Sequence, residues 1–488
     1  MDKKQCSINN ISRVTSGFVL AVFLTFPFFS CEKEPGFIED QSAKLSFSVD
    51  TLQFDTIFTT LGSITKSFTI HNKHNKQIRV AEVFLAGGEQ SPFRINIDGL
   101  NGMRFNNIDI LPNDSLYVFV EVTIDPNDIN APVVHGDSVV FMTNNNLQDV
   151  NLEAWGQDMH LYKEEIIESE IWTAEKPYLI YNYMAVDSGH TLTIQEGVKV
   201  YLHRNSSILV FGTMNITGTL DDPVIIQGDR LEEDYRGYLI PGQWERILFW
   251  PGSNGNTIDH AEIRNGNIGI QLGIDTIAEP ASITISNTKI FNMSYAGIFA
   301  FGSKIRAYNN VIANSGGYLT LCTLGGDYEF YHCSFYNRGV NFYSRNNPSV
   351  VATNLWYDSD DSTLLVGNLE NALFANSYIY GSEEHEFMIA GDPEMAALNF
   401  KVSNCLIRVD QSKINLTEPA HFENVYPYSS KTPLRLENPE EYDFQLDTLS
   451  VLQNIGSPVY GKLFPSDLKG DSRITDEAPD LGAYERVE

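Results

Sequence analysis

Apolar and polar residues alternate in a pattern that repeats along the second half of the chain. An Asn or His recurs with apolar residues on both sides, at intervals of 27, 22, 23, 22, 22 and 28 residues. The members of this column are His260, Asn287, Asn309, His332, Asn354, Asn376 and Asn404. Periods of about 20 to 50 residues are typical of solenoids, in which each repeat packs only on its neighbours. The pattern therefore predicts a stack of coils built from short strands.

The positions around each column residue predict which side chains face the interior. Residues four before, two before and three after it are apolar in nearly every repeat, as in Ile283, Ile285 and Ile290. Alternate residues of a strand point to opposite faces, so these positions face inward and those between them face outward. The column itself is polar but flanked by core, and stacked side chains of this kind can satisfy each other's hydrogen bonds. We expect a structural ladder, and a row of ligands or catalytic groups is the alternative.

A different pattern precedes the repeats. Seven short runs of alternating or β-branched residues lie within residues 45–160, separated by turn sequences such as Gly87-Gly88 and Asp98-Gly99. Closely spaced short strands with such turns predict an antiparallel β-sandwich over this range.

The remaining boundaries follow from changes in pattern. Residues 161–176 carry five glutamates and are expected to form an acidic linker. The solenoid is expected over residues 177–410. Residues 411–488 lose the period and are expected to hold the final coil or coils and a C-terminal cap, because a solenoid must cover its last apolar surface.

The first 30 residues carry a targeting pattern. Lys3, Lys4 and Arg13 precede an apolar run from Phe18 to Phe29. This run is too short for a comfortable membrane span, so residues 1–30 are predicted to be a secretory signal peptide. Residues 31–44 are polar and lack periodicity, which indicates a tether.

The residues at the end of the apolar run resemble two lipoprotein signals. Ser30-Cys31 resembles the lipobox of bacterial lipoproteins, which implies a lipid on Cys31. Glu32-Lys-Glu34 resembles the surface-export signal of Bacteroidetes-type lipoproteins, which implies an outer-membrane anchor with the protein facing the cell exterior. A plain signal peptide with an incidental Cys is the alternative.

Two further resemblances concern the fold. Four segments of the sandwich region resemble an immunoglobulin-like domain found at the front of Bacteroidetes surface lipoproteins. They are Phe54-Asp-Thr-Ile-Phe58, Leu61-Gly-Ser63, Phe93-Arg-Ile-Asn-Ile-Asp-Gly99 and Ala154-Trp-Gly-Gln-Asp158. Three later segments resemble the opening coils of right-handed parallel β-helices of the pectin-lyase-like superfamily. They are residues 190–201, 207–212 and 214–226. Together they imply an all-β protein, with an immunoglobulin-like β-sandwich followed by a right-handed parallel β-helix and its cap.

Charge and cysteine content narrow the partners. The formal net charge of −30 argues against nucleic acid as a partner. No Cys-x-x-Cys pair is present, so a zinc site has no support, and no cofactor is expected. The acidic clusters Asp358-Ser-Asp-Asp361 and Glu383-Glu-His-Glu386 are suited to Ca²⁺ or to acid–base work, with solvated loop charge as the alternative.

The outward columns hold the remaining candidate chemistry. Arg306 and Glu329 each precede the ladder residue of their own repeat by three positions. Because the two repeats are neighbours, the sequence predicts an ion pair between these side chains. A polysaccharide lyase or glycoside hydrolase would use these two with Asp358, Asp360 and Asp361. The column forms no carboxylate cluster, however, and the polygalacturonase-like signature is absent.

The outward columns after the ladder are aromatic. Tyr336, Trp356, Tyr378 and Tyr380 stand on successive repeats and predict a surface on which sugar rings could stack. A long loop that covers these rings is the alternative. We expect a non-catalytic cell-surface lipoprotein whose β-helix binds glycan or another surface component. A polysaccharide lyase or hydrolase, and an adhesin for a protein partner, are the other hypotheses.

Overall fold

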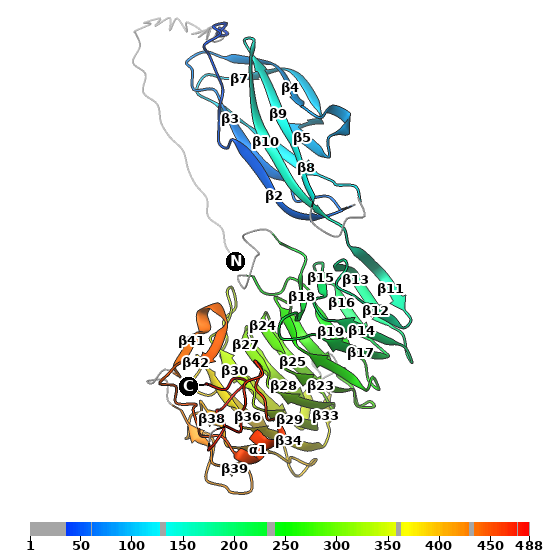
Figure 1. Cartoon of the computed structure of the whole chain (residues 1–488), viewed down its shortest axis with the longest axis vertical. Coiled ribbons are helices and arrows are strands. Elements are labelled where there is room, and N and C mark those ends of the chain that lie inside the picture. Colours follow the sequence, from blue (N-terminus) through cyan, green and yellow to red (C-terminus); the bar gives the residue numbers. More distant parts are fainter. Residues whose placement is uncertain are drawn as a thin grey trace, which may run out of the picture.

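The protein is all-β, with two regions of different strand arrangement (Figure 1). The computed structural model describes residues 36–59, 61–126, 133–231, 240–357, 363–428, 434–475 and 477–487. The predicted signal peptide and the candidate lipidation residue Cys31 lie outside these ranges. None of the helices within them is long and apolar enough to cross a membrane.

The N-terminal region is a sandwich of two five-stranded sheets, as the alternating runs predict. The first sheet has the order β1 (Ser46–Phe47), β3 (Lys66–His71), β8 (Ser115–Val122), β5 (Phe93–Ile97) and β6 (Leu100–Gly102). The second has the order β2 (Thr51–Phe58), β10 (Asn146–Gln157), β9 (Val133–Thr143), β4 (Ile78–Leu85) and β7 (Arg104–Ile110). A single turn of 3₁₀ helix lies at Gly88–Gln90. Phe54, Phe68 and Phe141 are buried in the shared core.

The second region consists of two large sheets of parallel strands, with 18 and 10 strands. The ten-stranded sheet has the order β12 (Glu170–Trp172), β14 (Thr191–Gln195), β17 (Thr213–Thr217), β20 (Asn256–Asp259), β23 (Ser282–Ser286), β26 (Lys304–Tyr308), β29 (Gly326–Tyr331), β34 (Leu369–Ala375), β37 (Lys401–Ser403) and β39 (Phe422–Glu423). Parallel sheets of this size are compatible with a β-helix.

The 18-stranded sheet contains two rows that share β13 (Tyr178–Val186), which also pairs with β11 (His160–Ile167). The first row continues through β16 (Ser207–Val210), β19 (Arg246–Phe249), β22 (Ile268–Leu272), β25 (Ala296–Phe301), β28 (Tyr318–Thr323), β31 (Val350–Thr353) and β36 (Phe387–Ala390). The second row continues through β15 (Lys199–Leu202), β18 (Val224–Gly228), β21 (Ala261–Arg264), β24 (Lys289–Met293), β27 (Val311–Ser315), β30 (Ser334–Asn337), β35 (Tyr378–Gly381), β38 (Leu406–Ile407) and β40 (Tyr426–Pro427).

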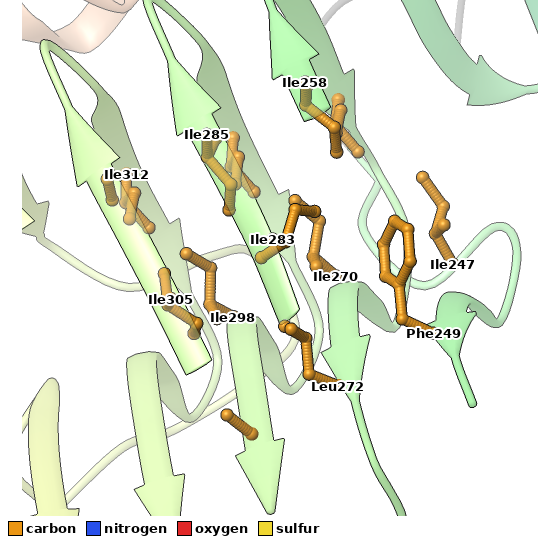
Figure 2. Close-up of a cluster of buried hydrophobic side chains, with 14 of the residues drawn as sticks. Ile247, Phe249, Ile258, Ile270, Leu272, Ile283, Ile285, Ile298, Ile305 and Ile312 are labelled. Carbon is orange, nitrogen blue, oxygen red and sulfur yellow. The ribbon is translucent and has the colours of Figure 1, made fainter. Parts of the chain in front are cut away.

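The interior between the ten-stranded sheet and the two rows is filled by apolar side chains, and each stacks on a similar side chain of the next turn. Ile258 is in register with Ile285 across β20 and β23, and Ile283 is in register with Ile305 across β23 and β26. Figure 2 shows these side chains turned into one continuous apolar core, with Ile312 of the second row facing them. Each turn of chain therefore buries its apolar face against the turns before and after it.

The acidic stretch predicted as a linker is instead the start of this stack. β11 pairs in parallel with β13, and β12 pairs in parallel with β14. Ile167 and Trp172 are buried in the core while most of the intervening glutamates face solvent. Because the apolar residues are few and the charges many, the composition of this stretch conceals its strand character. The sandwich meets the stack through a small apolar cluster, in which the rings of Phe58 and Tyr201 lie 5.1 Å apart.

The C-terminal segment leaves the stack and returns along its side. It contains the hairpin β41 (Leu436–Asn438) and β42 (Asp443–Leu446), a 3₁₀ turn at Pro439–Glu441 and the helix α1 (Pro458–Leu463). In Figure 1 this orange and red segment lies beside the last coils. Phe444, Leu481 and Tyr484 are buried in a cluster with residues of the second row. A second hairpin, of β32 (Leu355–Tyr357) and β33 (Leu364–Val366), projects after β31.

Candidate functional site

The recurring Asn and His residues stand at one corner of the stack, between the ten-stranded sheet and the second row. His260, Asn287, Asn309, His332, Asn376 and Asn404 all have φ between 47° and 55°. Asn is among the few residues that adopt this left-handed conformation at small cost. Asn309 Nδ2 donates to Asn287 Oδ1 at 3.1 Å, and Asn376 Nδ2 lies 3.2 Å from His332 Nε2. These contacts are those of a structural ladder.

Asn354 stands outside this ladder, contrary to the prediction. β29 pairs directly with β34, so His332 and Asn376 occupy successive turns although 44 residues separate them. Asn354 follows β31 of the first row, and its Nδ2 donates to the backbone oxygens of Asp392 and Ala396. The turn between His332 and Asn376 is twice the usual length, so it imitated two ordinary repeats. The seventh position belongs to Asn424, whose φ is 50°.

A second polar column escaped the sequence analysis. Asn265, Asn292, Asn314 and Asn337 repeat the ladder's first intervals of 27, 22 and 23 residues, five positions later. Asn292 Nδ2 donates to Asn265 Oδ1 at 2.9 Å, and Asn337 Oδ1 accepts from Ser315 N at 3.1 Å. The matching intervals were a readable signal for a second corner.

The predicted aromatic surface is covered, which corrects its assignment as a ligand face. Tyr378 is 0% and Tyr336 4% exposed. The ring of Tyr336 lies 5.5 Å from that of Tyr380 and 5.1 Å from Phe444 of the returning C-terminal segment. Trp356 is elsewhere, on β32 of the second hairpin, and its ring lies 5.0 Å from that of Phe301 on the first row. This face therefore matches the alternative given by the sequence analysis, in which a long segment of the chain covers the aromatic rings.

One of the two acidic clusters lies within the described structure. Asp358, Asp360 and Asp361 lie outside the described residues. Glu386 is fully buried, and its carboxylate accepts from both terminal nitrogens of Arg345, at 2.6 and 2.7 Å. It therefore anchors the loop before β36. Over the residues that the structure describes, no group of three or more His, Cys, Asp or Glu side chains is arranged to hold a metal ion.

A buried ionic network fastens the C-terminal segment to the ladder. Arg473 Nη1 donates to Glu485 Oε2 at 3.0 Å, and its Nη2 donates to Asn309 Oδ1 at 3.2 Å. Asn376 binds both the backbone N–H and the oxygen of Ser457. Burial, with the nearby charge of Asp480, raises the pKa of Glu485 to about 7, although Arg473 acts in the opposite direction. The ladder thus serves as the attachment line for the cap.

The outer face of the ten-stranded sheet is hollowed where β23, β26 and β29 lie side by side. A hollow of about 230 Å³ lies over these strands. It shares Thr284 and Arg306 with a hollow of about 680 Å³ beneath residues 463–470, and Lys304 and Asp327 with one of about 210 Å³ at the other strand end. Because the three hollows share lining residues, they lie next to one another along the strands, and we call them together the sheet groove.

The sheet groove presents charged and hydroxyl groups in register. Thr284, Arg306 and Glu329 are aligned on three adjacent strands, and Ser282, Lys304 and Asp327 form the neighbouring column. Arg306 Nε lies 3.6 Å from Glu329 Oε2, which confirms the predicted ion pair, and the two side chains are 50% and 31% exposed. Sequence reasoning found Arg306 and Glu329 but passed over the Lys304 and Asp327 column. Hydroxyl, cationic and acidic side chains therefore follow one another from β23 to β26 to β29, the chemistry of a surface that binds polar ligands.

One end of the sheet groove contains a histidine beside a carboxylate. His260 lines the largest of the three hollows of the sheet groove, and its Nδ1 lies 3.1 Å from Asp259 Oδ1. Asp259 also accepts from Ser286 Oγ at 2.7 Å and Asn287 Nδ2 at 2.8 Å. Burial raises the pKa of Asp259, but the hydrogen bonds from His260, Ser286 and Asn287 outweigh it and leave the pKa below the usual value. The carboxylate is thus held ionised at the ladder corner.

Comparisons with known proteins give no family. No protein-family profile matches the chain, and no curated protein matches it. Similar solved structures include a protein of unknown function from Porphyromonas gingivalis W83, with 12% identity over 26% of this chain and 51% of that one and a TM-score of 0.18. The ASH/PapD-like domain of human CEP192 is 8% identical over 29% of this chain and 99% of that one, with a TM-score of 0.18. The E. coli chaperone DraB is 10% identical over 23% and 54%, with a TM-score of 0.17.

The chain spans about half the length of the Porphyromonas and E. coli proteins. The TM-scores are too low to support an argument about fold or function, so the candidate site rests on its own geometry.

Proposed function

We propose that this protein is a non-catalytic cell-surface lipoprotein that binds glycan in the sheet groove. In this proposal the lipid on Cys31 anchors it to the outer membrane, facing the exterior. An immunoglobulin-like sandwich then acts as the spacer, and a right-handed parallel β-helix of the pectin-lyase-like superfamily presents the groove. The observation that carries the proposal is the row of exposed donors and acceptors over β23, β26 and β29.

The chemistry of the groove favours a hydroxyl-rich chain. Lys304, Arg306 and Thr284 offer hydrogen-bond donors, while Asp327 and Glu329 offer acceptors. The hydroxyls of a sugar chain both donate and accept hydrogen bonds. One sugar residue can therefore bind the donors and the acceptors of the groove at the same time. The floor is open along the strands, which suits an extended ligand more than a compact one.

Affinity electrophoresis tests this proposal. The purified protein is run through gels that contain soluble neutral polysaccharides (β-glucan, xylan, mannan, starch) or acidic ones (polygalacturonate, alginate, chondroitin sulfate). We expect retardation by at least one, and at least tenfold weaker binding by Arg306→Ala and Glu329→Gln with unchanged thermal stability. Retardation in no gel, or equal retardation of the variants, would contradict the proposal.

The anchor is tested separately in cells. Wild-type protein should incorporate radiolabelled palmitate and be removed from intact cells by added protease. Cys31→Ser should lose the label and remain unprocessed or soluble. Labelling of the Cys31→Ser variant, or complete resistance of the wild type to added protease, would contradict a lipid-anchored exterior location.

A polysaccharide lyase or glycoside hydrolase is the second candidate, because Asp327 and Glu329 stand two residues apart on one face of β29. That spacing is about 7 Å between Cα atoms, near the separation of carboxylates in inverting glycosidases. New reducing ends or unsaturated products from any polysaccharide above, if Asp327→Asn abolishes them, would favour the enzyme over the non-catalytic binding protein. Unchanged polysaccharide after prolonged incubation, with or without Ca²⁺, would exclude it for that panel.

A further inference from the structure

The outer face of the first sandwich sheet contains a pair of exposed aromatic rings. Tyr117 and Phe119 lie on β8, the central strand of this sheet, and are 58% and 42% exposed. Their centroids are 5.9 Å apart and their planes differ by 22°, so the two rings are stacked in one direction. The residues between and beside them, Val118 and Val120, are buried in the sandwich core. The alternation of β8 therefore fixes both rings on the outside.

The residues directly opposite these rings on the two neighbouring strands are polar and uncharged. On β3, Thr69 stands opposite Tyr117 and Ser67 stands opposite Phe119. On β5, Asn96 stands opposite Phe119, and its Nδ2 donates to Asn101 Oδ1 on β6 at 2.6 Å. The two rings thus have hydroxyls on one side and amides on the other.

The next cross-strand pair of this face, Glu121 on β8 and Arg94 on β5, has contacts of its own. Glu121 accepts from Thr65 Oγ1 at 2.6 Å, and Arg94 Nη1 donates to the backbone oxygens of Ser91 and Phe93, each at 2.7 Å. These two charged groups are therefore already partnered, while His71 Nε2 lies 2.8 Å from Thr69 Oγ1 and Asp98, just after β5, is exposed. The two rings and the residues opposite them offer an apolar platform with neutral hydrogen-bonding edges.

We propose that Tyr117 and Phe119 form a second binding site, which takes the pyranose rings of an uncharged glycan. One face of a pyranose ring carries C–H groups that pack on an aromatic ring, while its rim carries hydroxyls that reach neutral donors and acceptors. Two stacked rings with Thr69 on one flank and Asn96 on the other match both requirements. This site acts whether or not the sheet groove binds sugar.

The size of the platform favours a glycan over a protein. Two aromatic side chains cover roughly 300–500 Å² even when fully buried. A stable protein interface buries about 800 Å² on each partner. A short stretch of sugar chain needs only the area that the two rings provide.

The test is affinity electrophoresis of the full-length mature protein in gels that contain β-glucan, xylan, mannan or starch. We expect the double variant Tyr117→Ala/Phe119→Ala to bind at least one of these tenfold more weakly than wild type. Tyr117→Phe, which keeps the ring, should bind within about twofold of wild type. Phe342→Ala removes an 83% exposed ring from a loop of the other region and should have no effect.

The groove variant Arg306→Ala separates this inference from the proposed function, because it leaves the platform intact. Unchanged retardation of the double variant, or retardation of the wild type by none of the four polysaccharides, would overturn the inference. So would a concentration-dependent dimer in sedimentation velocity that the double variant abolishes, since the face would then meet a second copy of the chain. Equal thermal unfolding of all variants establishes that the losses are local.

Discussion

Two outer faces of the same parallel stack differ in how far the C-terminal segment covers them. The second row at β30 and β35 is covered by the returning C-terminal segment, and its tyrosines are core. On the ten-stranded sheet at β23, β26 and β29 the same segment covers only one strand end, where Phe464 packs on Tyr308 and Tyr331. The charged columns beyond that end remain exposed and line a groove. Aromatic residues that point out of a solenoid are thus not by themselves a binding face. Whether they are buried depends on where the rest of the chain returns.

The largest expected effect comes from breaking the ionic attachment of the covered face. At pH 8, Arg473→Ala leaves the ionised Glu485 buried without its cation, because the two side chains are 0% and 2% exposed. Loss of one partner of a buried pair costs about 3–5 kcal/mol. We expect the unfolding transition of the parallel-strand region in urea to shift accordingly. Arg306→Ala, which breaks an exposed pair, is the control and should cost about 1 kcal/mol or less. Equal losses would refute the distinction.

Truncation of a covered aromatic residue should come next. Tyr378→Ala removes a ring that is 0% exposed, and similar truncations of buried aromatic residues cost about 3–5 kcal/mol. Thr284→Ala on the open face should change the free energy of unfolding by about 0.5 kcal/mol or less. Urea denaturation of both variants measures the difference. A small loss for Tyr378→Ala would mean that the C-terminal segment is not packed on this face in solution.

The attachment should also respond to pH. Because the pKa of Glu485 is raised to about 7 in the folded protein, its protonated form is favoured there. Its contribution to stability is fully present below the ordinary carboxyl pKa and is lost as the pH rises through about 7. Limited proteolysis should therefore release the C-terminal segment faster at pH 8 than at pH 5.5. Glu485→Gln, which cannot ionise, should flatten this dependence, and an unchanged dependence in that variant would exclude Glu485 as its source.

The smallest effect on stability, and the largest on binding, is expected at the open face. Glu329→Gln should leave the urea midpoint nearly unchanged, because the pair with Arg306 is half solvated. Binding of the retarded polysaccharide should weaken at least tenfold, as judged by affinity electrophoresis over a concentration series. A matched substitution outside the groove, Glu437→Gln on β41, should change neither quantity. A binding loss as large at Glu437 would show that net charge, not the groove, governs retention.

Local patterns predicted the stack because each repeat carries its own inward and outward positions. The neighbours Arg306 and Glu329 could be placed in register from the ladder intervals alone, and the ion pair confirms that placement. Asn354 was misassigned because extra residues on both sides of β31 bring this turn to twice the usual length, with Asn354 at its middle. Its flanking residues Val350 and Ala352 are apolar since they face inward from the first row.

The covering of Tyr336 and Tyr378 had no local signal. It depends on contacts between residues more than 100 positions apart, such as the hydrogen bond from Ala483 N to Ser334 Oγ at 2.9 Å. A segment without periodicity gives no indication of which side of the stack it will follow. The choice between a ligand face and a covered face therefore required the three-dimensional structure.

Hydroxyl-radical footprinting with a retarded polysaccharide tests the central contrast between the two faces most directly. Leu463 borders the sheet groove and is 50% exposed, while Tyr426 on the second row is 40% exposed. Both side chains should be modified in the free protein. With polysaccharide bound, modification of Leu463 should fall several-fold and that of Tyr426 should not change. Protection of Tyr426 with continued modification of Leu463 would contradict the assignment of the binding face to the ten-stranded sheet.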